Sequence, residues 1–556
     1  MTAAASNASL LPLLTAPLLF FLVTYGLAWP VARRLALAPV ERLGVSTLLS
    51  TVGVFLVAWG IYVFTLPWTL VWVLPVAAAA GFFLGREALR EVWADRLARS
   101  LVVGHVILTA GCLGWLALIF SYGGGGWTGD WFEHWERAVF FLQRGPLDQK
   151  FIGYYALPAR PPLANVVTAA FLGLTRVDFA VYQVISTLGS GLAFVPAALL
   201  VRRFGGGPRA FAVLVVLLLV SPPFLQNGTF TWTKLPTAFF TLFGLYFFLS
   251  AQAAPATSRL PALLVALSLA AAVSAHYSGA PYILLLGVAW LWLRVRHTAL
   301  AFVVGAAFVA CWLGWLLSTY GVAGTFLSNS SVTAAAPSVG GQAVRALANL
   351  RDSLIPHFIR PFDTSLITQG NAWGRWRDWL FQAYQLNVIL SLGSVAWLGI
   401  AVALRRVWPA APWRARAFWT FFCVGAVIVG VCAHGGRDTW GLAHICLLPL
   451  VVLGLAFLAA QWSSLSRGWR GVLVVGGIVD FLCGIALHFV LQSLGPSHIA
   501  GFGDGSRINY DAKTFHQLRF LGDVLPASPL LLGALIAAVL ALALLRACRE
   551  PAAIEA

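Results

Sequence analysis

Long runs of apolar residues recur throughout this 556-residue chain and constrain its fold more than any other feature. A transmembrane helix needs about 20 consecutive, mostly apolar residues. Hydrophobic residues make up 60% of the chain, charged residues only 10%, and the mean hydropathy is +0.85. Soluble domains carry far more charge, so we expect an integral membrane protein. Because the runs are long rather than alternating, they favour a helical bundle over a barrel.

The length rule predicts an all-α polytopic membrane protein with about 15 transmembrane helices and additional external juxtamembrane helices. The expected spans are 11–29, 46–64, 68–85, 101–120, 178–201, 210–226, 236–250, 260–275, 281–296, 298–318, 386–404, 415–433, 441–460, 469–490 and 528–546.

Arginines gather in the short connections between the apolar runs and predict how the chain is oriented. The connection 86–99 carries four arginines, and we expect it to be cytoplasmic because cytoplasmic loops are enriched in Lys and Arg. Alternating from there places the other arginine-rich connections on the same side, provided that 161–174 lies at the interface as a juxtamembrane helix. The net charge of +17 and the pI near 10.2 are therefore attributed to orientation rather than to nucleic-acid binding.

Long connections then face the other side of the membrane. They are 121–177, 319–385 and 491–527, and all three lysines, Lys150, Lys234 and Lys513, fall on that side. Connections of this length are uncommon unless they are functional. We therefore expect the chemistry of this protein at the external face.

The first of these loops contains the stretch 123-GGGGWTGDWFEHWERAVFFLQRGPL-147. Asp130, Glu133 and Arg137 are spaced three and four residues apart, which places them on one face of a helix that begins near Asp130. The aromatic residues of the stretch are also explained by an interfacial amphipathic helix without any catalytic role. That simpler interpretation does not explain the segment that follows, where Arg160 precedes Pro161 and Pro162.

The order of these motifs resembles the first external loop of the GT-C-type membrane glycosyltransferases. The pattern is similar to that of the protein O-mannosyltransferases and of the aminoarabinose transferase that modifies lipid A. In these families an acidic residue follows a span, then come a helix, a glycine turn and a Lys-Pro-Pro-Leu motif. Here Asp130 lies fifteen residues before Gly145, and the sequence 160-RPPL-163 stands where the family has its Lys-Pro-Pro-Leu. Residues 178–206, 221–248 and 274–286 extend the resemblance.

The resemblance implies transfer of a sugar from a polyprenyl-phosphate-linked donor to an acceptor hydroxyl, with inversion at the anomeric carbon. Asp130 is the candidate general base for the hydroxyl proton. Trp131 replaces the second acid of the family's Asp-Glu pair, and Glu133 is the candidate to substitute for it.

Cations are needed to stabilise the leaving phosphate, and arginine suits this role because its planar fork matches phosphate oxygens. Arg160 is the first candidate because it lies in the matching motif, and Lys234 follows at the outer end of a span. Arg437, in 434-HGGRD-438, is a further candidate on the external side. His134 and His276 are candidate substrate contacts. His134, close to Asp130, could orient that aspartate or the acceptor, whereas His276 is also open to a structural interpretation as a hydrogen-bonded interfacial histidine.

The expected organisation follows from the resemblance and the span pattern. Residues 1–100 are additional N-terminal transmembrane helices, 101–320 the GT-C-like catalytic core with loop 121–177, 321–385 an external loop, and 386–556 the C-terminal helices with loop 491–527. The partners implied are the lipid-linked sugar donor, a lipid, glycan or protein acceptor, and the bilayer, with no nucleic acid. No cofactor is indicated; a divalent metal stays open, because the loop offers acids but no ligand cluster.

Richness in Ala, Arg and Gly suggests a bacterial inner membrane as the location, with the active site on the periplasmic or extracellular side. Three other functions compete with this interpretation, and one of them is non-enzymatic: a membrane scaffold for an envelope complex, for which D130N would have no effect. A transporter or flippase also has many spans, but paired repeats and polar groups at mid-membrane are expected there. An enzyme similar to O-antigen ligases would use diphosphate donors and outer-loop arginines, with no acidic base.

Overall fold

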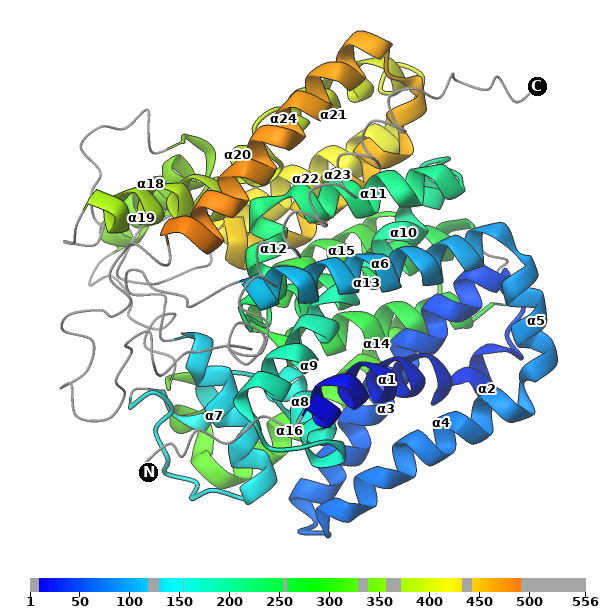
Figure 1. The fold of residues 1–556 in the computed structure, drawn as a ribbon, viewed down its shortest axis with the longest axis vertical. Helices are drawn as coiled ribbons and strands as arrows, with labels where there is room; N and C mark the ends of the chain where they lie inside the picture. Colours follow the sequence, from blue (N-terminus) through cyan, green and yellow to red (C-terminus); the bar gives the residue numbers. More distant parts are fainter. Residues whose placement is uncertain are drawn as a thin grey trace.

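The computed structural model describes residues 10–118, 130–153, 155–253, 258–328, 339–356, 372–432 and 443–491. Within these ranges the regular elements are helices, and the β-pairing consists of one isolated bridge between Phe151 and Tyr155. The helices lie alongside one another as a bundle (Figure 1). The predicted all-α class is confirmed.

The helices of the first half are α1 Leu10–Gly26, α2 Trp29–Ala32, α3 Pro39–Val63, α4 Val73–Leu84, α5 Arg86–Ala94, α6 Arg96–Leu118, α7 Asp130–Gln143, α8 Leu163–Leu174, α9 Phe179–Gly191, α10 Phe194–Arg203, α11 Pro208–Val220, α12 Pro222–Thr229, α13 Lys234–Ala253 and α14 Leu260–Ala275. The second half contains α15 Ala280–Trp292, α16 Thr298–Phe326, α18 Val339–Leu354, α19 Ala372–Leu386, α20 Val388–Ser391, α21 Ala396–Val407, α22 Trp413–Cys432, α23 Leu448–Ala460 and α24 Arg467–Ile485. Short 3₁₀ or π segments are η1 Trp68–Trp72, η2 Leu157–Ala159, η3 Tyr277–Gly279, η5 Ala443–Leu447, η6 Trp462–Ser464 and η7 Ala486–Val490.

Eight helices among the described residues are long and apolar enough to cross a membrane, or up to 10 if each of two bent pairs is one span. The expected count of about 15 spans is therefore not confirmed. The expected spans 260–275, 281–296 and 441–460 correspond to shorter apolar helices, and 528–546 lies outside the described residues.

The expected span 210–226 contains a sharp bend, and the expected span 68–85 ends at one. The helices α11 and α12 meet at 77°, and the pair formed by residues 68–84 and 86–94 is bent by 73°. At the first bend Pro222 and Pro223 follow Ser221, whose hydroxyl accepts a hydrogen bond from the Phe224 amide at 3.4 Å. Proline lacks an amide hydrogen and disfavours helical backbone in the residue before it, so a helix cannot run straight through this point.

The expected span 386–404 is wrong as one continuous helix. The chain breaks between α20 and α21, where Gly393 adopts a left-handed φ of 119°. Asp480, buried in α24, closes the break by accepting hydrogen bonds from the Ser394 amide at 2.9 Å and from the Tyr384 hydroxyl at 3.0 Å. Asp480, although it lies in an apolar helix, therefore supplies hydrogen-bond acceptors for polar groups at the break.

The centre of the bundle is formed by helices that are apolar on all sides. In α10 the residues from Phe194 to Val201 are all buried, and α13 is buried from Lys234 to Leu249 apart from the half-buried Pro236. The helix α13 packs against α10, α14 and α23. A helix that is hydrophobic all round belongs inside a bundle. The packing along α13 therefore fixes the positions of both of its ends.

The two ends of the bundle carry different elements. Figure 1 shows α7, α18 and α19 at one end and α5 at the opposite end. The parts of loops 121–177 and 319–385 that the structure describes therefore share an end, as the orientation predicts. The helix α8, predicted not to cross, has 12 residues, fewer than a span requires.

Candidate active site at the α7 end of the bundle

The helix α7 begins at Asp130, where the sequence predicts a helix start, and is amphipathic. On its apolar face Ala138, Phe140 and Phe141 are buried, and the Phe141 ring packs edge-on against Tyr62 of α3 with centroids 5.0 Å apart. This packing fixes the helix against the bundle. The backbone of Asp130 is described, but its side chain lies outside the described atoms.

Glu133 lies at the centre of a buried charged cluster. Its side chain is fully buried, and one carboxylate oxygen lies 2.8 Å from Arg137 Nη2, while the other lies 3.4 Å from Arg160 Nη2. Arg137 Nε also donates a hydrogen bond to Glu133 Oε1 at 2.9 Å. Glu133 is thus the link between α7 and the Arg-Pro-Pro-Leu motif that precedes α8.

Arg137 ties α7 to the segment before that motif. Its Nη1 donates to the Leu157 carbonyl at 2.8 Å, its Nη2 donates to the Ala156 carbonyl at 3.1 Å, and its guanidinium lies 4.3 Å from the centre of the Phe151 ring. The guanidinium is almost completely enclosed, and its donors bind protein groups. Sequence reasoning placed Arg137 on the helix face but missed this role; its spacing of four residues from Glu133 is the signal.

Arg160 follows η2 and is held on several sides. Its guanidinium stacks 4.6 Å from the centre of the Tyr155 ring, in addition to the ion pair with Glu133. The preceding Pro158 carbonyl accepts a hydrogen bond from the Tyr277 hydroxyl of η3 at 3.0 Å. The motif that the sequence resemblance emphasises is therefore packed between α7 and the turn after α14.

The charges of the cluster determine the protonation state of Glu133. Burial alone would raise the pKa of this carboxyl, but the charges of Arg160 and Arg137 outweigh burial and hold the pKa well below its usual range. Glu133 is therefore ionised at neutral pH and holds two arginines. A carboxylate with so low a pKa is a weak base, so these contacts favour a positioning role for Glu133.

His134 lies beside this cluster and is neutral. Its Nδ1 is 3.0 Å from Asn165 Oδ1 in α8. Burial, together with the charges of Lys234 and Arg160, lowers the pKa of His134 to about 3 against the opposing effect of Glu133. Asn165 Oδ1 accepts a hydrogen bond from the protonated Nδ1, and Nε2 is then the unprotonated nitrogen. Asn165, which sequence reasoning missed, is an amide in the apolar sequence of α8.

A narrow cavity of about 50 Å³ adjoins His134 and runs between α1, α8, α9 and α13. Polar groups line it, among them His134, Asn165 and Thr231, together with aromatic rings such as Phe171 and Phe239. Lys234 begins α13 close by, is buried, and has its ammonium 5.6 Å from the centre of the Trp232 ring.

His276 is placed differently from the other candidates. It ends α14 and caps η3, where its Nδ1 accepts a hydrogen bond from the Ser278 amide at 3.1 Å and lies 2.9 Å from Ser278 Oγ. These contacts favour the structural interpretation of this histidine, although its neighbour Tyr277 contacts the Arg160 segment. Arg437 lies outside the described residues.

The structure therefore brings together Glu133, His134 and Arg160, with Lys234 next to His134. Ionisable groups from α7, the 160–163 motif and the start of α13 meet at one end of the bundle. Among the described residues no group of three or more His, Cys, Asp and Glu side chains could hold a metal ion.

Comparisons with known proteins bear on this region. Residues 126–313 match the family described as dolichyl-phosphate-mannose-protein mannosyltransferase. A comparison with curated proteins finds no match. The crystal structure of ArnT from Cupriavidus metallidurans bound to undecaprenyl phosphate is similar with a TM-score of 0.49 and 16% identity, covering 80% of this chain and 73% of that one. The apo form of the same protein gives a TM-score of 0.44 and 17% identity, over 80% and 75% of the two chains.

The family match spans every described residue of the site, from Glu133 to His276. The resemblance to GT-C-type membrane glycosyltransferases is thereby confirmed, and this chain is similar to the mannosyltransferase family over residues 126–313.

Proposed function

We propose that this protein transfers a sugar from a polyprenyl-phosphate-linked donor to an acceptor hydroxyl, with the reaction at the α7 end of the bundle on the external side of the membrane. The acceptor oxygen attacks the anomeric carbon, the bond from that carbon to the phosphate oxygen breaks, and the phosphate leaves with the electron pair. The family match and the likeness to a structure bound to undecaprenyl phosphate suggest this donor class.

The observation that carries the proposal is the gathering of cationic side chains at the site. Arg137, Arg160 and Lys234 meet there near ionised Glu133, with neutral His134 beside them. Arginine and lysine bind phosphate oxygens through charge-assisted hydrogen bonds. A phosphate group bound beside Arg160 and Lys234 would interact favourably with both charges.

These cationic side chains also match the course of the reaction. A sugar-phosphate diester carries about one negative charge, and the phosphate monoester that leaves carries about two near neutral pH. Cations held in place before the reaction therefore interact more strongly with the transition state than with the donor. Glu133 contributes by holding Arg160 in position.

Asp130 is the proposed general base. It lies one helical turn before Glu133, at the first residue of α7, where the helix dipole favours an ionised carboxylate. Neutral His134, with Nε2 available as an acceptor, is proposed to bind a hydroxyl of the sugar or the acceptor. We also propose that arginine and lysine supply the charge stabilisation without a divalent metal, so activity would survive EDTA.

Transfer from radiolabelled polyprenyl-phosphate sugars, assayed in membranes that contain the full chain, tests the proposal. We expect R160A and D130N to lose at least about 100-fold in transfer, as removal of a charge-stabilising group or a base does. The matched control is R176A, which removes an exposed arginine beyond the other end of α8. Full activity of R160A, or equal losses in R160A and R176A, would contradict the proposed phosphate site.

A further inference from the structure

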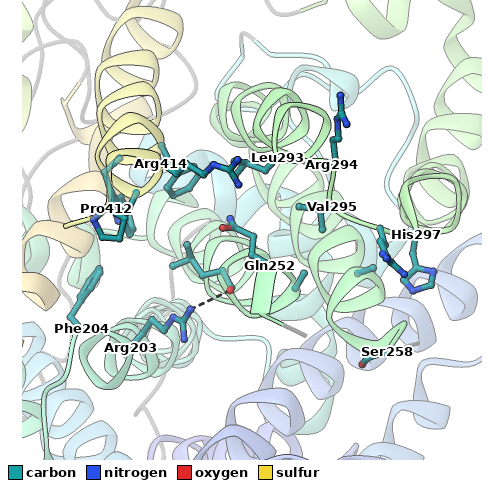
Figure 2. A pocket seen from close by; sticks show the side chains of 17 residues that line it. Arg203, Phe204, Gln252, Ser258, Leu293, Arg294, Val295, His297, Pro412 and Arg414 are labelled. Atoms are coloured by element: carbon teal, nitrogen blue, oxygen red, sulfur yellow. Dashed lines mark hydrogen bonds between the residues drawn. The ribbon is translucent and has the colours of Figure 1, made fainter. Parts of the chain in front are cut away.

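A second cation-lined cavity lies at the other end of the bundle. It measures about 650 Å³ and is bounded by the ends of α10, α13, α15 and α22 (Figure 2). Lys234 begins α13 at the candidate active site, and Gln252 of the last turn of α13 lines this second cavity. The intervening helix is about 30 Å long, so the two sites are separate. Ligand pockets typically measure about 300–1,000 Å³.

Cationic side chains dominate the polar lining of this cavity. Arg203 and Arg414 lie on either side of Gln252, and the Arg203 guanidinium donates to the Leu249 carbonyl at 3.4 Å (Figure 2). Arg294, Arg296 and His297 also line it, and none of its 17 described lining residues is an acid. The neighbouring Arg202, in contrast, pairs with Glu41 at 3.2 Å. The cavity is therefore complementary to an anion.

Helix-end electrostatics do not account for this arrangement. Arg203 ends α10 and suits the negative end of the helix dipole, but Arg414 lies in the first turn of α22, where a cation is unfavourable. The connection between α15 and α16 also holds two non-glycine residues in left-handed backbone, Arg294 with φ 51° and His297 with φ 63°. Such conformations carry a free-energy cost and often occur at binding sites.

The apolar part of the lining indicates the kind of anion. Phe204, Leu249, Phe418 and Trp419 form a continuous apolar wall beside the arginines, and Phe204 packs against Trp419 with ring centroids 5.7 Å apart. The cavity lies at the ends of helices that are long enough to span the membrane, α13 and α22 among them. An apolar wall does not stabilise a small soluble anion, whereas a phospholipid presents a phosphate next to acyl chains that can contact the wall.

We infer that this cavity binds the phosphate headgroup of an anionic membrane lipid, with Arg203 and Arg414 on the phosphate, Gln252 donating a hydrogen bond, and the aromatic wall against the glycerol and upper acyl chains. This lipid site is independent of the proposed transfer reaction.

Native mass spectrometry of the full-length protein, titrated with phosphatidylglycerol or phosphatidylcholine, tests the inference. We expect R203Q/R414Q to weaken phosphatidylglycerol binding on the order of thirtyfold, given the usual contribution of each arginine near a lipid surface. The control R90Q/R96Q removes the same charge from exposed positions at the same end of the bundle. The ion pairs Arg42–Glu91 and Arg202–Glu41 join this region to the end of α10, which bounds the cavity. The control is expected to bind the lipid as the wild type does.

A variant that keeps all charges covers the case in which R203Q/R414Q does not fold. Ala251 lines the cavity and is half-buried, so A251W fills the space and should also displace the lipid. Equal weakening in both double variants, retention of the lipid by A251W, or equal affinity for phosphatidylcholine would overturn the inference. Complete displacement by millimolar inorganic phosphate would also overturn it, because the site would then belong to the soluble anion.

Discussion

At the scale of single residues, the geometry of Glu133 shows how one buried carboxylate organises a site. The carboxylate pairs with Arg137 on its own helix and with Arg160 across the loop. Removing one member of a buried ion pair leaves the other charged and desolvated. The stability of this end of the bundle and the position of Arg160 therefore depend on the same side chain.

Substitution of Glu133 tests this dependence. We expect E133Q to lower the free energy of unfolding by about 3–5 kcal/mol, the usual cost of breaking a buried pair, and to reduce transfer because Arg160 loses its anchor. Thermal unfolding in detergent measures the first effect. Glu87 is exposed on α5, so E87Q is the matched control. Equal stability of E133Q and E87Q would show that the pair contributes nothing net.

His134 predicts a pH dependence of stability. Burial lowers the pKa of His134 to about 3 in the folded protein, so folding favours its neutral form. The usual value is about 6.5, so below that pH the unfolded chain takes up a proton that the folded protein does not. Stability from this residue is full above pH 6.5 and is lost as the pH falls toward 3.

The loss from His134 alone amounts to about 2 kcal/mol at pH 5. Unfolding temperatures of the wild type and H134Q, followed between pH 8 and pH 5, isolate this contribution. The curve of H134Q is expected to be flatter than that of the wild type. Parallel curves would mean that folding does not shift the pKa of His134.

Sequence reasoning reaches some residues of the site and not others, for physical reasons. The spacing of Glu133 and Arg137 predicts that they meet, because residues four apart on a helix are neighbours. The approach of Arg160 to Glu133 depends on the path of the chain through Phe151, η2 and the contact with Tyr277, which no local pattern encodes. The tautomer of His134 depends in the same way on Asn165 of another helix.

At the scale of secondary-structure elements, polar groups decide where the apolar runs break. Hydropathy alone joins residues 386–404 into one span, because the break at Gly393 contains no charged residue and no proline. Its partner, Asp480, comes from α24, distant in the sequence. A continuous apolar run can thus contain a helix break that is stabilised by tertiary hydrogen bonds. A count of apolar residues cannot detect such a break.

Alanine at Gly393 tests this break. The residue has φ 119°, and an added Cβ would lie 2.7 Å from Asp480 Oδ2. We expect G393A to lower stability by more than about 1 kcal/mol, since both backbone and contact are incompatible with a side chain. At Gly468 in α24 nothing lies within 4 Å of an added Cβ, so G468A should be neutral or stabilising. A fully stable G393A would argue against the break in the membrane-embedded protein.

At the scale of the whole molecule, cations occur at both ends of the bundle in different settings. At the α7 end they are buried and organised around Glu133; at the α5 end they are mostly exposed and surround a cavity. The distribution agrees with the predicted orientation, in which exposed arginines lie on the cytoplasmic side.

Cysteine labelling in intact cells tests this orientation. In a chain whose native cysteines have been replaced, we expect K150C to react with a membrane-impermeant maleimide and R90C to react only after permeabilisation. Both positions are exposed. Arg90 lies in α5, and Lys150 precedes Phe151, which contacts Arg137 of α7 at the opposite end of the bundle. Reaction of R90C in intact cells would reverse the orientation and place the candidate site inside the cell.

The narrow cavity beside His134 has a consequence for how fast a long lipid can be used. At about 50 Å³ it has room for a few water molecules but not for an isoprenoid chain, so α1, α8, α9 and α13 must separate before such a donor fits. If only one molecule in a hundred is open at a given moment, the apparent dissociation constant is about 100 times the intrinsic one. Bilayer thickness and temperature, which change how readily helices part, would then regulate turnover without touching any catalytic group.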